Sequence, residues 1–283
     1  MTEKIIIASD STTDLGPELI EKYNIRILPL GVSLGEQFYK DGVDITSDDI
    51  YSFYEKNGVL PKTSAPNIGE LTDFFGKLVS DGSSVIYFTI SSLMSSSYSN
   101  ACIAASEYDN IHVVDTKNLT SGGGLIVLKA CEMVSEGTLS ADVIAAKCRE
   151  LTEKTEASFV VDSLEFLKKG GRCSSLAALG ANLLSIKPKI VVKDGKMEVG
   201  TKYRGKFQAV LSKYIHELLD NRDDIDLSAA FVTHAGVDES VIEACIEEVK
   251  NTVNFENIYI SHAGCTICSH CGKDTVGILF MRK

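Results

Sequence analysis

Short apolar runs alternate with amphipathic stretches through the first half of the chain. The run Ile5-Ile6-Ile7-Ala8 is typical of a buried strand, and a polar loop follows it directly. Stretches with helical spacing come after such runs, which favours a mainly parallel sheet covered by helices. The expected strands are residues 5–8, 25–30, 85–90 and 111–114. The expected helices are residues 17–23, 47–56, 124–134 and 140–154, with two more starting near residues 67 and 98.

The second half of the chain has a different pattern. Asp194-Gly195 suits a tight turn, so the flanking residues 190–193 and 196–199 are predicted to form a hairpin. A hairpin with helices indicates an α+β domain with antiparallel strands. We therefore expect an α/β protein of two domains, residues 1–155 and 156–283. The remaining elements expected in the second domain are strands 159–161, 229–233, 258–261 and 276–281 and helices 206–219 and 239–250.

Composition narrows the class of protein. The 283 residues are enough for two domains, and 44 % hydrophobic with 24 % charged residues is ordinary for a globular chain. We expect a cytoplasmic protein without membrane insertion, because the sequence shows neither a signal peptide nor a membrane-spanning apolar run. The net charge of −11, without a basic block, argues against binding to nucleic acid.

Three polar loops follow strands of the predicted parallel sheet. Parallel sheets bind ligands beyond the carboxyl ends of their strands, and hydroxyls with free N–H groups at helix starts suit an anionic group. The alternative is that these residues only cap helices. Three such loops on one sheet edge favour an anion site over capping alone. The loops are residues 10–14, 91–97 and 115–124.

Two further segments carry candidate polar groups. Pro61 and Pro66 stiffen a short extended segment that can hold Thr63 and Ser64 as donors, although the residues alone favour a plain connector. The glycines before Arg172 allow a sharp turn that places its guanidinium beyond the helix. A phosphate or protein contact and a solvated turn are both compatible with that position.

Three of the eight cysteines form a Cys-x-x-Cys-x-x-Cys run, Cys265, Cys268 and Cys271, with His262 upstream. Such a run resembles part of a zinc or iron–sulfur site. A second cysteine pair is absent, and so is the Cys-Pro that ends the bacterial cluster motif. If the segment were extended, Cys265 and Cys268 would also face opposite sides of a sheet. We expect no metal, and a metal or redox sensor remains an alternative.

Taken together, the motifs resemble those of the DegV family over nearly the full length of the chain. Each motif alone is weak, but eight in the family's order are specific. They are Asp10-Ser11-Thr12-x-Asp14-Leu15, residues 39–45 (YKDGVDI), Pro61-Lys62-Thr63-Ser64-x-Pro66, Ile90-Ser91-Ser92-x-Met94-Ser95 with Tyr98, residues 115–124, residues 167–172 (LKKGGR), Ile186-Lys187-Pro188 and His270-x-Gly272.

The resemblance implies a two-domain fold with a long-chain fatty acid bound between the domains. It implies that Thr63, Ser95 and His270 hold the carboxylate. Some family members are binding subunits of a bacterial fatty acid kinase and present the carboxylate to a separate ATP-binding subunit. The resemblance associates the glycine-flanked Arg172 with that partner, and implies no cofactor. The other expected ligand-binding residues are Ser64, Ser96, Ser97 and Gly272.

The residues themselves fit a binding protein better than a kinase. Two hydroxyls and an imidazole can hold a carboxylate, and the sequence has no Gly-x-x-x-x-Gly-Lys motif for ATP. An alternative from the enzyme class is an acyl hydrolase or transferase that uses Ser95 and His270 with an acid such as Asp10. Turnover of an acyl ester would separate this alternative from binding.

Three departures from the family pattern lie near the expected site. Ser95-Ser96-Ser97-Tyr98 stands where Ser-Gly-Thr-Tyr is usual, and Gly272-Lys273-Asp274 stands where Gly-Pro-Gly is usual. Cys268 takes the place of a usual glycine two residues before His270. These changes allow for a different ligand, or for a protein without a kinase partner.

Overall fold

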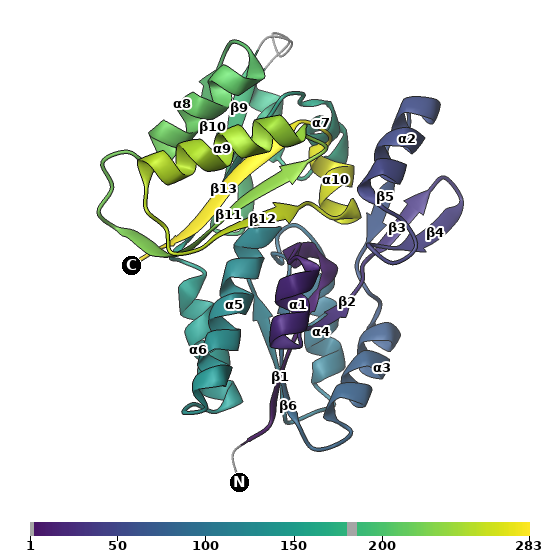
Figure 1. The fold of residues 1–283 in the computed structure, drawn as a ribbon. Helices are drawn as coiled ribbons and strands as arrows, with labels where there is room; N and C mark the ends of the chain where they lie inside the picture. Colours follow the sequence, from purple (N-terminus) through teal and green to yellow (C-terminus); the bar gives the residue numbers. More distant parts are fainter. Residues whose placement is uncertain (1–2, 180–185) are drawn as a thin grey trace.

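The computed structural model describes residues 3–179 and 186–283, which form three β-sheets covered by helices (Figure 1). The first sheet is entirely parallel, with strand order β2-β1-β6-β7. Its strands are β1 (Ile5–Asp10), β2 (Arg26–Leu28), β6 (Ser84–Thr89) and β7 (Ile111–Asp115).

Helices cover both faces of this parallel sheet because successive strand residues point to opposite sides. On β6, Val85 and Tyr87 pack with Phe75 of α3, whereas Ile86 and Phe88 pack with Ile126 of α5. Helices α3 (Ile68–Val79) and α4 (Ser97–Ala105) cover the first face. Helices α1 (Pro17–Tyr23), α5 (Ser121–Glu136) and α6 (Ala141–Leu151) cover the second.

The second sheet is mixed and has six strands in the order β10-β9-β8-β13-β11-β12. Every neighbouring pair is antiparallel except β11 and β12, which are parallel. Helices α8 (Phe207–Leu219) and α9 (Glu239–Thr252) cover its outer face. The strands are β8 (Thr155–Val161), β9 (Lys187–Lys193), β10 (Lys196–Tyr203), β11 (Ile225–Ala235), β12 (Ile258–His262) and β13 (Thr275–Arg282).

Helix α5 lies between the parallel and the six-stranded sheets and joins them in one apolar core. Its residues pack with Ile7 and Ile86 on one side and with Phe231 and Leu279 on the other. The glycines at its start permit this close approach. A Cβ at Gly122 would lie 2.2 Å from the Asn118 Oδ1 and 3.2 Å from the Ala157 Cβ.

A third, small antiparallel sheet lies beside α2 (Ser47–Asn57), next to the parallel sheet (Figure 1). The sequence analysis did not predict this sheet, because its strands are only three or four residues long and have no clear apolar alternation. Two short helices that follow β8 and β12 were not predicted either. The strands are β3 (Gly31–Leu34), β4 (Gln37–Lys40) and β5 (Lys62–Ser64), and the helices are α7 (Glu165–Gly170) and α10 (Cys265–Cys271).

The predicted fold class is confirmed: a parallel sheet with helices, followed by a mixed sheet with mainly antiparallel strands. The hairpin turns at Asp194 and Gly195, whose φ angles of 49° and 79° are those expected of such a turn. Thr46, rather than Ser47 to Asp49, caps α2, because its side chain pairs with the backbone and side chain of Asp49. The domain boundary expected after residue 155 stays a prediction.

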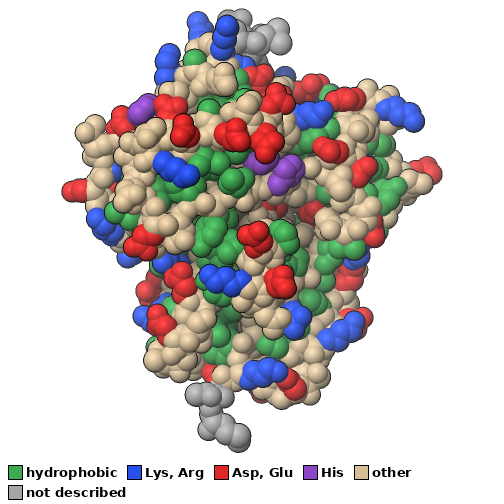
Figure 2. Space-filling model, viewed as in Figure 1, with side chains coloured by type: hydrophobic (Ala, Val, Ile, Leu, Met, Phe, Trp, Pro, Cys, Tyr) green, Lys and Arg blue, Asp and Glu red, His purple; other side chains and the backbone are tan. Residues whose placement is uncertain are grey.

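Acidic and basic side chains are interspersed on the face of the molecule in Figure 2 and do not gather in one basic patch there. Within residues 3–179 and 186–283, the structure has no helix that is both long and apolar enough to cross a bilayer.

Candidate functional site

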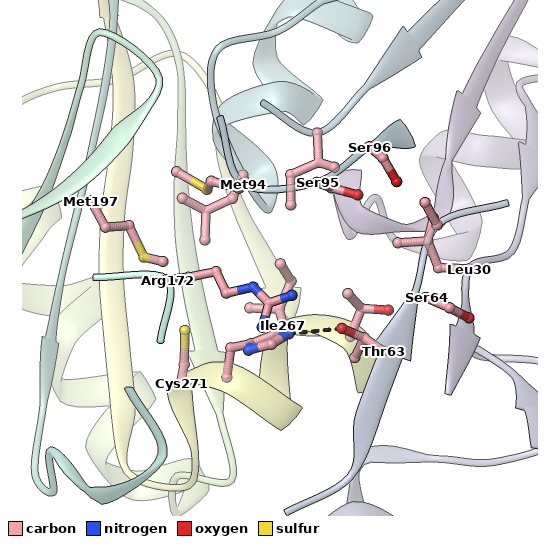
Figure 3. Close-up of a pocket in the computed structure, with 15 residues that line it drawn as sticks. Leu30, Thr63, Ser64, Met94, Ser95, Ser96, Arg172, Met197, Ile267 and Cys271 are labelled. Atoms are coloured by element: carbon pink, nitrogen blue, oxygen red, sulfur yellow. Dashed lines mark hydrogen bonds between the residues drawn. The ribbon is translucent and has the colours of Figure 1, made fainter. Parts of the chain in front are cut away.

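A pocket of about 340 Å³ lies where the small sheet, the loop before α4, helix α10 and the six-stranded sheet meet (Figure 3). Hydroxyl, imidazole and guanidinium groups line part of it, and aliphatic and sulfur-containing side chains line the rest. The lining residues are Leu30, Thr63, Ser64, Ala65, Ile90, Met94, Ser95, Ser96, Leu119, Arg172, Met197, Thr266, Ile267, His270 and Cys271.

The small sheet positions Thr63 and Ser64. Both residues lie on β5, which pairs with β3 so that Thr63 is opposite Val32. The proline-flanked segment is therefore a short strand paired with β3, and not the plain connector that its residues alone favour. Both residues lie at the pocket, but the Thr63 hydroxyl points to His270, whereas the Ser64 side chain points away from it (Figure 3).

The serine loop before α4 places two of its three predicted residues in the pocket. Ser95 and Ser96 line it, whereas Ser97 is buried at the first residue of α4 and is not among the lining residues. The Ser97 hydroxyl lies 2.9 Å from the Ser95 hydroxyl, and the Ser97 N–H donates to the Ser95 Oγ at 3.2 Å. Ser97 therefore orients the Ser95 hydroxyl through these two contacts.

Helix α10 carries His270, and two buried carboxylates anchor the start of this helix. Asp41 accepts hydrogen bonds from the Cys265 and Thr266 N–H groups at 2.8 and 3.2 Å. Asp14 accepts one from the Gly264 N–H at 3.0 Å. The first N–H groups of a helix have no partner within the helix, so these carboxyl oxygens satisfy them and fix α10 against the loops of the parallel sheet.

His270 is partly buried, and one of its ring nitrogens has a protein partner. Its Nε2 lies 2.8 Å from the Thr63 Oγ1 (dashed line in Figure 3). Its Nδ1 is buried and has no partner among the described residues. Burial, followed by the nearby charge of Arg172, lowers the pKa of His270 to about 4. The imidazole is therefore neutral near pH 7 and can donate one hydrogen bond and accept another.

Arg172 lines the same pocket, although the sequence analysis assigned it only to a partner contact. The chain turns at Gly171, where φ is 70°, and the Arg172 guanidinium donates to the Gly170 carbonyl at 2.8 Å. Figure 3 shows its side chain running past Ile267 into the pocket. The residue is also solvent-exposed, so it can contact a ligand and another protein together. The partner contact itself stays a prediction.

Gly272 has a structural position outside the pocket lining. It ends α10 with a φ of 79°, and a Cβ there would lie 2.8 Å from the ring of Phe166. Thr63, Ser64, Ser95, Ser96 and His270 thus lie around one pocket, whereas Ser97 and Gly272 support its walls.

The sequence analysis missed the apolar part of the pocket and one polar group. Thr266 lies on α10, and its hydroxyl is buried without a hydrogen-bond partner among the described residues. A buried hydroxyl without a hydrogen-bond partner destabilises the fold unless a ligand or a water molecule supplies that partner. Spacing gave no signal for Thr266, because the helical fold of its segment was not predicted. The missed apolar residues include Leu30, Leu119, Met197, Ile267 and Cys271.

The geometry does not favour a hydrolase. A nucleophilic serine needs a histidine within hydrogen-bond reach, and that histidine needs an orienting group. The Ser95 hydroxyl bonds to Ser97, whereas His270 bonds to Thr63. Asp10 accepts hydrogen bonds from Thr12 and from the Ile90 N–H, and among the described residues it makes no hydrogen bond to the imidazole.

The cysteine run does not form a metal site in the part of the chain that the structure describes. Its segment is the helix α10, where all three thiols are buried. Burial raises the pKa of Cys265 and of Cys271 to about 12 and raises that of Cys268, so these groups are thiols near neutral pH. Metals bind thiolates. Within residues 3–179 and 186–283, no three His, Cys, Asp or Glu side chains lie together as metal ligands.

Comparison with known proteins agrees with this architecture. The family model described as "Uncharacterised protein, DegV family" matches residues 4–283. A DegV domain-containing protein of Clostridium acetobutylicum is 33 % identical over 99 % of this chain and 99 % of its own. One of Caldanaerobacter subterraneus is 31 % identical over 99 % of this chain and all of its own.

Solved structures give the same result. A DegV family protein from Thermus thermophilus, described by its fatty acid binding, superposes with a TM-score of 0.89 at 28 % identity, covering 99 % of this chain and all of that one. A stearic acid-binding protein from Eubacterium ventriosum superposes with a TM-score of 0.85 at 32 % identity, covering 98 % of both chains. The protein therefore belongs to the DegV family.

Proposed function

We propose that this protein binds a long-chain fatty acid and presents its carboxylate to a separate ATP-dependent kinase, which forms the acyl phosphate. In this proposal Thr63, Ser95 and His270 hold the carboxylate. The protein itself is a lipid-binding subunit and not the catalyst. Its likeness to fatty-acid-binding DegV structures supports the binding part of the proposal.

The observation that carries the proposal is the division of the pocket into a polar and an apolar part. Thr63 and Ser95 supply hydroxyls, and Arg172 supplies a positive charge beside them. Hydrogen bonds to a carboxylate are about twice as strong as those between neutral groups. The apolar part suits an alkyl chain, where each buried CH₂ contributes about 0.8 kcal/mol.

Presentation to a kinase is supported by the exposure of the head-group end. Arg172 is solvent-exposed while its side chain lines the pocket. A carboxylate held beside it is accessible to the active site of a docked protein. The planar guanidinium suits both a carboxylate and a phosphate, which are the reactant and the product groups of the proposed reaction.

The test compares palmitate with hexadecanol, which has the same chain length and no carboxylate. Binding that depends on the proposed head-group site should favour palmitate at least about tenfold, because charged hydrogen bonds are lost with the alcohol. A kinase catalytic subunit and ATP should then produce palmitoyl phosphate only when this protein is added. Equal affinity for both lipids would contradict the head-group assignment, and no acyl phosphate would contradict presentation.

A further inference from the structure

Two further hollows lie next to the pocket and share lining residues with it or with each other. A narrow hollow of about 20 Å³ shares Leu119, Ile267 and Cys271 with the pocket. At its other end it shares Ala157, Ser158 and Val192 with a third, larger groove of about 740 Å³. The narrow hollow therefore lies between the pocket and a groove beside β8 and β9.

The narrow hollow runs along the inner face of the six-stranded sheet. Thr233 and Gly277 are register partners on β11 and β13, and Ala157 lies opposite Leu279 on the neighbouring strand pair. Gly277 has no side chain at all on this face. The surface that lines this hollow is apolar, which suits an alkyl chain.

The groove at the far end differs in chemistry from the hollow. Lysine, arginine and acidic side chains line it, and several are already paired with one another. Arg222 pairs with Glu156 at 2.7 Å, and Lys189 pairs with Glu217 at 2.6 Å. A polar group that arrives there meets charged side chains and solvent instead of an apolar wall.

We infer that the acyl slot is open at both ends, so that the far end of a long chain reaches this polar groove. The inference rests on the proposed fatty acid binding and names a wider ligand class: long acids whose far terminus is itself polar, including α,ω-dicarboxylic acids. Val192 and Ala157 line both the narrow hollow and the groove, so the proposed far opening lies between them. Val192 is only partly buried on β9 and is the more tolerant of the two to substitution.

Dicarboxylic acids test the open end on the unchanged protein. In a slot closed at its far end, a second carboxylate would be buried in apolar surroundings, and each diacid should bind at least about a hundredfold more weakly than its monoacid. In the open slot, diacids long enough to reach the groove should bind within about tenfold of the monoacid. The probes are laurate, palmitate, stearate and behenate, each with its α,ω-diacid.

A substitution then locates the opening. Val192→Phe should weaken behenate and the long diacids about tenfold or more and leave laurate unchanged, because only long chains pass the narrowed bore. Val143→Phe on exposed α6 is the matched control and should change none of them. Val192→Ala should preserve long-diacid binding even if the Phe variant does not fold.

The binding results distinguish an open far end of the slot from fatty acid binding itself. If monoacids bind and every diacid fails, the slot is closed and the inference is wrong, while the proposed function stands. If Val192→Phe folds and affects laurate and behenate equally, the far opening does not lie at Val192. If no monoacid of any length binds, the proposed function fails and the inference fails with it.

Discussion

At the scale of single residues, the site depends on side chains from distant parts of the chain. Thr63 and His270 are 207 positions apart in sequence, and their side chains are in hydrogen-bond contact. Their bond leaves the neutral imidazole with one unpaired buried nitrogen among the described residues. A bound carboxylate would bring new hydrogen-bond and charge partners to this pair.

Replacing a hydroxyl by hydrogen should weaken fatty acid binding. Thr63→Ala and Ser95→Ala each remove a donor to a charged group, worth about 1.5–3 kcal/mol, so affinity should fall about tenfold or more at each site. Displacement of a fluorescent fatty acid would measure the change. Ser92→Ala, at an exposed residue outside the pocket, is the control. Unchanged affinity in both folded variants would show that the carboxylate lies elsewhere.

Arg172 should affect both binding and presentation. Arg172→Ala removes a positive charge from the pocket lining, so affinity for palmitate should fall about tenfold, and kinase-coupled acyl phosphate formation should fall further. Arg172→Lys keeps the charge but loses the planar fork, so it should restore binding more than turnover. The rate of acyl phosphate formation with each variant is compared with that of the unchanged protein at saturating palmitate. Full turnover by the Ala variant under that condition would rule out a role in presentation.

At the scale of elements, α10 is the part of the site that depends most on its anchors. Asp41, which is 4 % exposed, accepts hydrogen bonds from two N–H groups of α10 and from the Ser11 hydroxyl at 3.0 Å. These bonds connect the helix that carries His270 with the first loop of the parallel sheet. The position of the imidazole therefore follows from a carboxylate about 230 residues earlier in the chain.

Removing this anchor should reduce stability and binding together. Asp41→Ala leaves three donors without their acceptor, so the free energy of unfolding should fall by about 2 kcal/mol or more. Fatty acid affinity should fall with it, because His270 and Thr266 lie on the loosened helix. Urea denaturation with a binding titration gives both values. Asp73→Ala on the exposed side of α3 is the control, and an equally small effect of the two variants would contradict the anchoring role.

The sequence predicted the long elements and most of the polar site, but not the short elements that assemble it. Apolar spacing located the longer helices α5 and α6, and Asp194-Gly195 located the hairpin. Helix α10 has seven residues and owes its start to Asp14 and Asp41, which are distant in sequence. Tertiary contacts of this kind leave no local periodicity, so the cysteine segment and Thr266 could not be placed.

At the scale of the whole molecule, buried acids join the two halves of the chain. The Thr120 hydroxyl donates to the Asp14 carboxylate at 2.6 Å, and the Ser261 hydroxyl donates to the Asp14 carbonyl at 2.5 Å. Burial raises the pKa of Asp14 well above its usual value, and burial likewise raises that of Asp10 to about 6. The folded protein therefore holds protons that the unfolded chain releases.

This linkage predicts lower stability at alkaline pH. A carboxyl whose pKa is raised on folding stabilises the protein below its unfolded pKa, and that contribution is lost as pH rises through the folded pKa. The lowered pKa values of His234 and His270, both about 4, act in the opposite direction only at acidic pH, up to the usual histidine range. The Asp14 contribution therefore falls as pH rises above the usual aspartate range, with a slope of up to about 1.4 kcal/mol per pH unit.

Asp14→Asn is the variant that isolates this contribution. An amide can accept from the Gly264 N–H and donate to the Thr120 hydroxyl, and asparagine tolerates the φ of 47° at this position. Urea denaturation over a pH series above the usual aspartate range should show a free energy of unfolding that falls more steeply with pH for the unchanged protein than for the variant. Parallel profiles would contradict the assignment to Asp14.

The central claim is that the space between the sheets is a fatty acid site. Native mass spectrometry of the protein purified from cells, without added lipid, tests it most directly. A fatty acid site predicts a mass increase equal to one long-chain fatty acid, which solvent extraction removes and added palmitate restores. A single lipid-free mass, unchanged after incubation with palmitate, would contradict the account.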